Sequence, residues 1–482
     1  MVENVGSCAI LKSANNLNIN VGGPTMYYYS IFQQLFKFVP RYRFEKSVEK
    51  HSGDRYCKHF TAIRQFKTVL YAQLAGKDSL REVESGLLMN AGRMYHLDME
   101  AVSRSTLSDA MNRRSPEIFR AMFEEVLDRA LACAPGHGFK FKNPLYAIDS
   151  TTIALSLTVY NWAKYRKQKG AIKLHTQLDL SGNLPCYVLM TNGKMADVRT
   201  AKKNIKIVPD SIYTFDKGYY DLNWFRQIDE AGAFFVTRIK NNARFKVAGQ
   251  HHPALPKKGV ISDERIGYTG QASFKKYPGK LRLIEFMDDE GKTYQFLTNN
   301  FKLAASSIAE IYRQRWQIEL FFKWIKQNLK IKSFFGTSKN AVMTQIWVAL
   351  ILYLLLSYIK FTGKCRYGIT ELANRLRDTL MSDFALVEVL NLNRDTLKKP
   401  PDWNAPEQLD LFANYVPTMS LSLPGYFLNE AEPVYPMRSS EITPFFGRAG
   451  RCCPATSKRA LFLILVTKKA PASSICRNQF KS

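Results

Sequence analysis

The sequence predicts an α/β protein in which a helical domain precedes a mixed core and further helices follow it. Apolar residues recur at helical spacing between residues 60 and 131, which indicates a bundle of helices. That spacing stops at the Pro-Gly-His-Gly segment of residues 135–138, and β-rich runs begin after it. Because strand, hairpin, helix and strand then alternate before helices resume at residue 306, the middle of the chain is expected to form an α/β layer.

The balance of charge and hydrophobicity excludes a disordered polycation. The chain has 482 residues with 69 Lys and Arg against 41 Asp and Glu, so its formal net charge is +28. With 46% hydrophobic and 13% aromatic residues it can bury large cores, which a disordered basic tail cannot do. The positive charge therefore lies on folded surfaces and predicts a polyanionic partner, either nucleic acid or an anionic membrane.

A membrane location is disfavoured by the length of the apolar runs. The longest run covers residues 346–359. This run is shorter than the roughly 18 to 20 residues that cross a bilayer, so a buried core helix is expected. Residues 1–20 show no secretory signal. The eight Cys residues lack C-x-x-C spacing, which favours a reducing cytoplasm.

Capping residues predict where the first helices begin. A helix is expected at residues 63–74, a second after Ser79, and another from Ser115-Pro116-Glu117 onward. Residues 103–114 would form a short helix that ends in Asn-Arg-Arg. This helix and its neighbour resemble a helix-turn-helix, although an ordinary bundle with solvated Arg side chains gives the same pattern.

Short apolar runs predict the strands of the α/β layer. The expected strands cover residues 145–149, 172–180, 184–191, 212–216 and 234–238, with a helix at 222–231. Residues 241–300 break this rhythm with several Pro and Gly residues. Two alternating strands then follow, at residues 281–286 and 293–298. The interruption predicts a small β insertion.

The helix predicted at residues 311–326 carries the most informative pattern. At about 100° per residue, one narrow face collects Tyr312, Arg315, Glu319, Lys323 and Lys326. The apolar stripe of the same helix borders this face, so one carboxylate lies among cations at the edge of a buried core. A solvated face with an ion pair between Glu319 and Lys323 would give this pattern in an arbitrary helix.

Two carboxylates elsewhere favour a site over a solvated face. Asp149 ends one predicted core strand and Asp216 ends another, at the sheet edge where ligand clefts form. With Glu319 they offer the oxygen ligands that Mg²⁺ prefers. Two such ions about 4 Å apart would activate a water or a 3′-hydroxyl and stabilise the leaving oxygen of a phosphodiester. The neighbouring cations of the helix would then hold phosphates.

These residues resemble the DDE transposases of bacterial insertion sequences, specifically the insertion-sequence-four group. That group carries a motif of Tyr, two residues, Arg, three residues, Glu, six residues and Lys. The motif is matched at every position by Tyr312, Arg315, Glu319 and Lys326. The segment AIDSTT at residues 147–152 is similar to the first catalytic block of the family, and FDKGYY at residues 215–220 to the second.

The resemblance implies a complete reaction. It implies an RNase H-like core in which Asp149, Asp216 and Glu319 form the catalytic and metal-binding triad, with Mg²⁺ or, as a substitute, Mn²⁺. Cut-and-paste transposition would follow: nicking at the element end, excision, and attack of the freed 3′-hydroxyl on target DNA. The residues expected at DNA phosphates are Tyr312, Arg315, Lys323 and Lys326.

The resemblance also implies partners and an organisation of the chain. The partners would be double-stranded DNA, as terminal inverted repeats and as target, and a second copy of the chain that pairs two ends at the bacterial nucleoid in the cytoplasm. The predicted parts are a leader (1–25), an N-terminal helical DNA-binding domain (26–135), an RNase H-like catalytic core (136–240 and 301–345), a β insertion (241–300), C-terminal helices (346–400) and a poorly ordered tail (401–482).

Several residues admit a second interpretation. Asp197 could replace Asp216 as the second metal ligand, although its position fits a helix N-cap better. Lys173 and His175 share one strand face and either line the catalytic edge or form a core-edge pair. Solvation is expected for His251-His252. For Trp316 and Trp324, core packing is favoured over stacking on unpaired bases.

Two other functions share much of the pattern. A DNA-binding protein without catalytic activity would have the same charge and helices, but it would not need the intact set of carboxylates. An RNase H-like nuclease would need the carboxylates but would not join the freed ends to a target.

Overall fold

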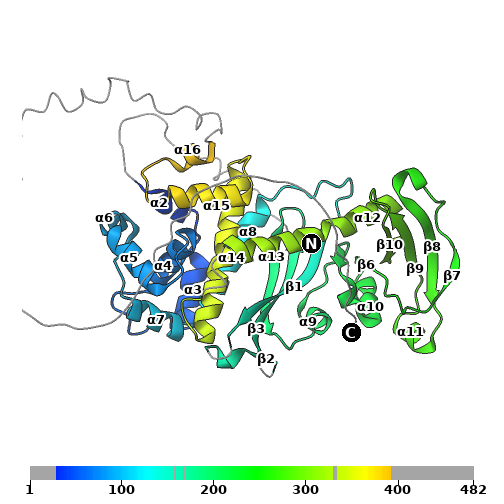
Figure 1. Cartoon of the computed structure of the whole chain (residues 1–482), viewed down its shortest axis with the longest axis horizontal. Helices are drawn as coiled ribbons and strands as arrows, with labels where there is room; N and C mark the ends of the chain where they lie inside the picture. The colour runs from blue at the N-terminus through cyan, green and yellow to red at the C-terminus, as the bar shows by residue number, and fades with distance from the viewer. Residues whose placement is uncertain (1–28, 157–158, 167–168, 329–333, 392–482) are drawn as a thin grey trace, which may run out of the picture. The chain divides into compact units, whose positions relative to one another are not determined.

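A computed structural model describes residues 29–391, except residues 157–158, 167–168 and 329–333 (Figure 1). All described residues belong to one structural unit, Met1–Asp402. The leader predicted at residues 1–25 and the tail predicted at residues 401–482 lie outside the described residues.

The N-terminal region is a helical bundle whose helices begin where the capping residues predict. The Ser79 hydroxyl accepts a hydrogen bond from the Glu82 N–H at 3.2 Å, and the Ser103 hydroxyl accepts one from the Thr106 N–H at 3.2 Å. The helices are α2 (Ile31–Phe36), α3 (Tyr42–Lys50), α4 (Ala62–Leu74), α5 (Leu80–Met89), α6 (Ala91–Met94), α7 (Arg104–Arg113) and α8 (Glu117–Ala132). Helix α4 is buried along most of its length and forms the centre of this bundle.

Helix α14 (Lys339–Thr362) joins the bundle to the rest of the described chain. It extends well beyond the apolar run of residues 346–359, because the Ser338 hydroxyl caps it by accepting a hydrogen bond from the Ala341 N–H at 3.2 Å. Helix α14 is long and apolar enough to cross a membrane, yet 89% of its apolar window is buried inside the protein. It packs against α4, α7 and α8, so the predicted buried core helix is confirmed. Helices α15 (Ile369–Asp378) and α16 (Leu386–Asn391) follow.

One continuous sheet of ten strands forms the middle of the molecule. Its strands are β1 (Leu145–Leu155), β2 (Lys164–Arg166), β3 (Lys169–Asp179), β4 (Leu184–Asn192), β5 (Ile212–Phe215), β6 (Phe234–Arg238), β7 (Phe245–Gln250), β8 (Val260–Tyr268), β9 (Leu281–Met287) and β10 (Thr293–Thr298). The order is β2-β3-β1-β5-β6-β10-β9-β8-β7, with β4 paired to β3. The β1–β5 and β5–β6 pairs are parallel and the other pairs are antiparallel, so the predicted RNase H-like α/β class is confirmed.

Helices cover both faces of this sheet and divide its core in two. The helices are α9 (Asp197–Asn204), α10 (Leu222–Glu230), α11 (Gln271–Lys276), α12 (Ala305–Gln314) and α13 (Trp316–Asn328). On one face Val236 and Phe296 pack in a cluster that includes Tyr312 of α12. On the other face Phe235 stacks on Phe225 of α10, with ring centroids 4.3 Å apart. Because strand side chains alternate, the central strands β1, β5, β6 and β10 contribute to both clusters.

The β insertion extends the core sheet. Strand β10 pairs with the core strand β6, and β9, β8 and β7 continue outward from it (Figure 1). The sequence predicts two of these strands, and the structure adds β7 and β8. The insertion therefore leaves the core after β6 and returns beside β6.

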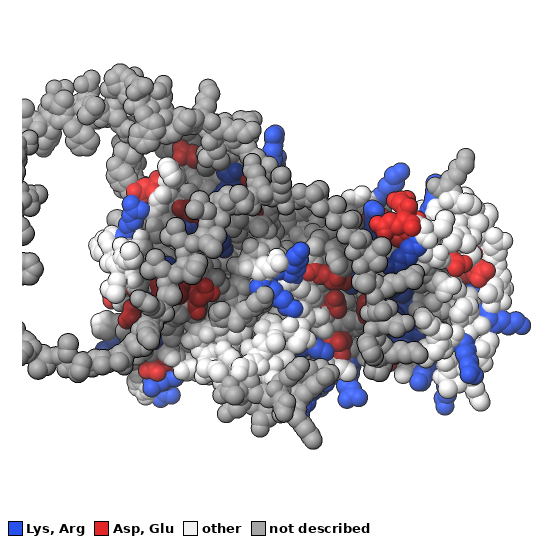
Figure 2. Space-filling view, in the orientation of Figure 1, with Lys and Arg blue, Asp and Glu red and all other residues white. Residues whose placement is uncertain are grey.

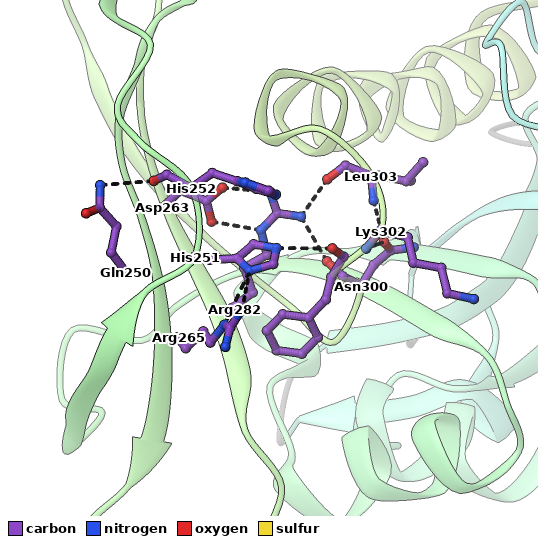
Figure 3. Close-up of polar contacts among 10 residues, drawn as sticks. Gln250, His251, His252, Asp263, Arg265, Arg282, Asn300, Lys302 and Leu303 are labelled. Atoms are coloured by element: carbon purple, nitrogen blue, oxygen red, sulfur yellow. Dashed lines mark hydrogen bonds and ion pairs between the residues drawn. The ribbon is translucent and has the colours of Figure 1, made fainter.

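A fully buried ion pair connects the insertion to the helix that follows it. Arg282 of β9 donates to both carboxylate oxygens of Asp263 on β8, at 2.8 and 2.7 Å, and both side chains are 0% exposed (Figure 3). The same guanidinium donates to the carbonyls of Asn300 and Leu303, at 3.1 and 2.6 Å. Asn300 and Leu303 belong to the connector of residues 299–304, which joins β10 to α12. Because α12 begins directly after this connector, Arg282 fixes how α12 leaves the sheet.

The connector also accounts for His251, which the sequence predicts to be solvated. Its Nε2 lies 3.1 Å from the Phe301 carbonyl oxygen, and its ring packs edge-on against the Phe301 ring. Arg265 donates to the other ring nitrogen at 3.3 Å. The expectation of a solvated side chain is therefore wrong for His251, because the fold brings the connector against it (Figure 3).

Loss of one partner of the buried ion pair should destabilise the protein strongly. Arg282→Met leaves the Asp263 carboxylate buried without a cation and is expected to lower the free energy of unfolding by about 3–5 kcal/mol. Replacing both partners, Arg282→Met with Asp263→Leu, should cost less because no charge remains buried. Urea unfolding followed by circular dichroism measures both. The exposed Arg265→Ala serves as control, and equal losses for the single and double variants would contradict this account.

Candidate active site

Asp149 lies where the parallel pairing of β1 ends. The sequence places Asp149 at the end of its strand, but β1 continues to Leu155 because β3 pairs with it along this whole length. The parallel partner β5 stops earlier, and its last pair with β1 is Ile148 with Phe215. Asp149 is therefore in the middle of its strand, but it is the first residue beyond the pairing with β5.

Asp216 follows β5 and is held by its own turn. It is the N-cap of a short 3-10 helix (Lys217–Tyr219), and its carboxylate accepts a hydrogen bond from the Gly218 N–H. A Cβ at position 218 would lie 2.7 Å from the Asp216 Oδ1, so any other residue there would displace this carboxylate. Asp149 and Asp216 are the residues that follow the last parallel pair, Ile148 with Phe215, and Asp216 lies near enough to raise the pKa of Asp149.

Glu319 reaches the sheet from α13, which is not continuous with α12. The predicted single helix of residues 311–326 is broken at Arg315, whose N–H bonds the Tyr312 carbonyl at 3.1 Å in a tighter turn. The Arg315 backbone itself stays right-handed helical, so the motif residues keep the order along the helix that the sequence predicts. Across the break, Arg315 still donates to Glu319 at 2.7 Å.

Arg315 connects the Asp149 carboxylate of the sheet with the Glu319 carboxylate of α13. One of its terminal nitrogens donates to Glu319, and the other lies 3.9 Å from Asp149. The Arg315 side chain is 14% exposed and that of Asp149 is 23% exposed, so water screens these charges little. The guanidinium thus neutralises carboxylates from two segments that are far apart in the sequence.

Burial raises the pKa of Asp149 to about 6. The neighbouring carboxylates of Asp216 and Glu319 raise it further, whereas the Ser150 N–H and Arg315 favour the charged form and lower it. A buried carboxylate whose charge is only partly neutralised by its neighbours is typical of a metal ligand, where a divalent cation supplies the missing positive charge.

A pocket of about 450 Å³ opens beside these carboxylates. It is lined by residues 149–151 of β1 and by Glu319, Phe322, Lys323, Lys326 and Gln327 of α13. Tyr312 and Arg315 line a second pocket of about 530 Å³, toward the insertion. On the face that Figure 2 shows, acidic side chains gather near the middle of the described surface, with Lys and Arg side chains on both sides.

The donor set fits a hard divalent cation. Asp149, Asp216 and Glu319 supply carboxylate oxygens, which Mg²⁺ and Mn²⁺ prefer, and burial leaves Asp149 short of positive charge. Within the part of the chain that the structure describes, no three acidic, His or Cys side chains already surround a single point. The Arg315 guanidinium lies between Asp149 and Glu319.

Asp197, weighed above as an alternative ligand, belongs to a different network. It is the first residue of α9, and it accepts a hydrogen bond from the Ser150 hydroxyl at 2.5 Å. Lys173 lies 3.1 Å and His175 Nδ1 3.4 Å from the same oxygen. Burial lowers the pKa of His175 to about 4, against the opposing effect of Asp197. Ser150 and Asp149 are successive residues of β1, so their side chains point to opposite faces of the sheet. Asp197, which binds Ser150, therefore lies on the face opposite to the Asp149 carboxylate.

Ser150 links this network to the site. Its N–H donates to the Asp149 Oδ1 at 2.8 Å while its hydroxyl is held by Asp197.

The two Trp residues of the motif helix have different environments in the structure. Trp324 packs edge-on against Tyr353, and Trp316 is 54% exposed.

The sequence interpretation missed one cation at the site. Arg238 ends β6, and its guanidinium carbon lies 5.8 Å from the centre of the Tyr312 ring, with that of Arg315 at 5.6 Å. The signal was present in the sequence, since three of the predicted strands, 145–149, 212–216 and 234–238, end in Asp149, Asp216 and Arg238. Only the parallel register shows that they form one row.

Comparisons with known proteins identify the family. Residues 140–355 match the family model described as the transposase DDE domain, and residues 28–100 match a domain of unknown function, DUF4372. The y4zB protein of Sinorhizobium fredii is 36% identical over 253 residues, which are 52% of this chain and 69% of that protein. A Synechocystis protein named for insertion sequence element IS4SA is 26% identical over 274 residues, 55% of this chain and 75% of its own. Both are named as transposases.

Among solved structures, the piggyBac transposase synaptic complex with hairpin DNA matches 82% of this chain and 87% of its own. The identity is 11% and the TM-score is 0.38.

The raised pKa of Asp149 predicts how stability depends on pH. Its folded pKa of about 6 exceeds the ordinary value of 3.8, so folding favours the protonated form. This contribution is present below pH 3.8 and is lost as the pH rises through about 6. Asp149→Asn should therefore stabilise the metal-free protein at about pH 7.5, by at most roughly 3 kcal/mol, and have no effect near pH 4. Thermal melts at both pH values test this.

The exposed Asp109→Asn is the matched control and should leave the melting temperature unchanged at both pH values. A melting temperature of Asp149→Asn that falls below that of the unsubstituted protein at the higher pH would contradict the prediction.

Proposed function

The chain belongs to the DDE transposases, and from that premise we propose that it moves an insertion sequence by a cut-and-paste reaction. Two observations support this proposal. Asp149 and Glu319 come from distant segments, line one pocket together and share Arg315. Asp216 lies on the strand next to Asp149, one residue beyond the last pair.

The three carboxylates would hold the divalent ions of the reaction. When bound, Mg²⁺ or Mn²⁺ would lower the pKa of an attacking water or 3′-hydroxyl and stabilise the leaving oxygen. Asp216 is oriented for this role by the Gly218 N–H, and Asp149 by the Ser150 N–H. Each of the two Asp side chains is thus held at one oxygen by a backbone donor, whereas Glu319 is held by the Arg315 side chain.

The cations around the carboxylates would hold the DNA backbone. Lys323 and Lys326 line the pocket of Asp149 and Glu319, so they are placed to contact phosphates on the α13 side. Tyr312 and Arg315 lie on the side of the insertion. Arg315 is paired with carboxylates in the DNA-free protein, and a divalent cation at those carboxylates would release its guanidinium for a phosphate.

The proposed substrate is double-stranded DNA, first as the terminal inverted repeats and then as the target. Two ends must be joined in one reaction, so a homodimer is proposed at the synapsis step. The helical domain of residues 26–135 is the proposed DNA-binding domain, and the reaction is placed at the nucleoid of a bacterial cytoplasm. The formal charge of +28 supports an affinity for DNA that falls steeply with salt.

Glu319→Gln tests the catalytic role. The substitution keeps the shape of the side chain and removes its charge, so cleavage of a duplex carrying the element end in Mg²⁺ should fall roughly a thousandfold. Affinity for the same duplex should persist. Gel analysis of nicked strands and fluorescence anisotropy measure the two quantities.

Glu230→Gln on α10 is the control, because Glu230 is exposed and forms an ion pair with its helix neighbour Arg226 on the other face of the sheet. Cleavage by Glu319→Gln at the unsubstituted rate would exclude the proposed active site.

Strand transfer separates a transposase from a simple nuclease. Pre-cut ends with a free 3′-hydroxyl, incubated with supercoiled plasmid and Mg²⁺, should yield joined products because the same carboxylates activate the hydroxyl. Ends that carry a 3′-dideoxynucleotide should give none. Cleavage of intact ends without any joining of pre-cut ends would favour a nuclease over the proposed reaction.

A further inference from the structure

The register of the parallel strands places a cation in the row of catalytic carboxylates. Strand β5 pairs with β6 through Thr214 and Val236. Extending this pairing by two residues brings Arg238 beside Asp216, just as Asp216 lies beside Asp149. Residues two apart on a strand share a face, so Arg238 points to the same side as Val236, which packs with Tyr312 of α12.

Arg238 has no structural partner that accounts for its charge. Its Nε is buried without a hydrogen-bond partner, and among the described residues no carboxylate forms an ion pair with it. Its contact is the ring of Tyr312, which lies between the guanidinium groups of Arg238 and Arg315. The Tyr312 hydroxyl is also buried, and within the described part of the chain no hydrogen bond satisfies it, although Arg315 lies near enough to lower its pKa. An unpaired guanidinium and hydroxyl at one point offer donors to an anion.

A pocket opens at this point on the far side from Lys323 and Lys326. It has a volume of about 340 Å³, and its polar lining includes Lys217, Arg238, Asn241 and Glu285. Two cations and one carboxylate leave it a charge of +1. Lys217 directly follows Asp216 and is exposed, so one wall of the pocket is a single residue from Asp216 and is open to a large ligand.

We propose that Arg238, assisted by Lys217 and Asn241, binds a backbone phosphate of the element end on the Asp216 side of the active site. This inference rests on the proposed function. The DNA would then be held by cations on two sides of the carboxylates: by Lys323 and Lys326 next to α13, and by Arg238 at the end of β6. The Tyr312 ring lies between the guanidinium groups of Arg238 and Arg315 and separates the two charges.

The salt dependence of DNA binding tests this proposal. The ligand is a labelled duplex copied from the DNA next to the coding sequence, in EDTA so that no cleavage occurs. Each phosphate contact contributes roughly 0.9 to the slope of log Kd against log salt. Arg238→Ala should lower the slope by about this amount and weaken binding roughly tenfold at moderate salt. Arg238→Lys keeps the charge and should retain most of the slope.

Arg226→Ala is the matched control, because Arg226 pairs with Glu230 on the opposite face of the sheet. It should keep the original slope. An unchanged slope for Arg238→Ala, with the fold intact by circular dichroism, would overturn the proposal. A change seen only with an unrelated duplex would overturn the assignment to the element end.

Failure of the proposed function gives a different result. Glu319→Gln removes no cation and should bind the duplex with at least the slope of the unsubstituted protein. If Glu319→Gln cleaves DNA normally, the catalytic assignment fails while the slope test of Arg238 still decides the phosphate site. If the unsubstituted protein does not bind the duplex at all, both are wrong.

Discussion

The parallel register of β1, β5 and β6 is the constraint on which the site depends. These strands pair residue for residue from Leu145, Ile212 and Phe234, so their ends lie at one level of the sheet. The next residues on the α12 side are two carboxylates and a guanidinium. Their spacing is therefore set by backbone hydrogen bonds between strands, which side-chain changes alter little. The turn at Gly218 and the pairing of β1 with β3 hold the ends of these strands in place.

Helix α13, which completes the site, is positioned from the side of the β insertion. Glu319 and Arg315 stand at the beginning of α13, and α12 leads to them from the connector that Arg282 holds by two carbonyls. The insertion is thus more than an added surface, because its buried ion pair fixes where α12 begins. The two helices divide the contacts between them: Tyr312 of α12 lies against Arg238 of β6, and Glu319 of α13 lines the pocket beside Asp149 of β1.

The fold class, and the proximity of Asp149 and Glu319 in one pocket, could be predicted from the sequence, because both rest on local patterns. The apolar runs before Asp149 and Asp216 mark two core strands, and the spacing from Tyr312 to Lys326 marks the motif helix. Non-local pairing could not be predicted. The extension of β1 beyond Asp149 depends on β3. Arg238 was missed for the same reason, since its place in the row exists only once β5 and β6 are paired.

If the proposed function is correct, the carboxylates and cations that lie close together at the site couple the binding of metal to the binding of DNA. A protein with a formal charge of +28 disfavours the approach of a divalent cation, yet the buried Asp149 is only partly neutralised by Arg315. DNA that binds to the surrounding cations cancels this repulsion and brings its own phosphate oxygens to the carboxylates. Metal and DNA should therefore bind cooperatively, each raising the affinity for the other by the same factor. The guanidinium of Arg315 serves both states, because it can neutralise carboxylates before the metal arrives and a phosphate afterwards.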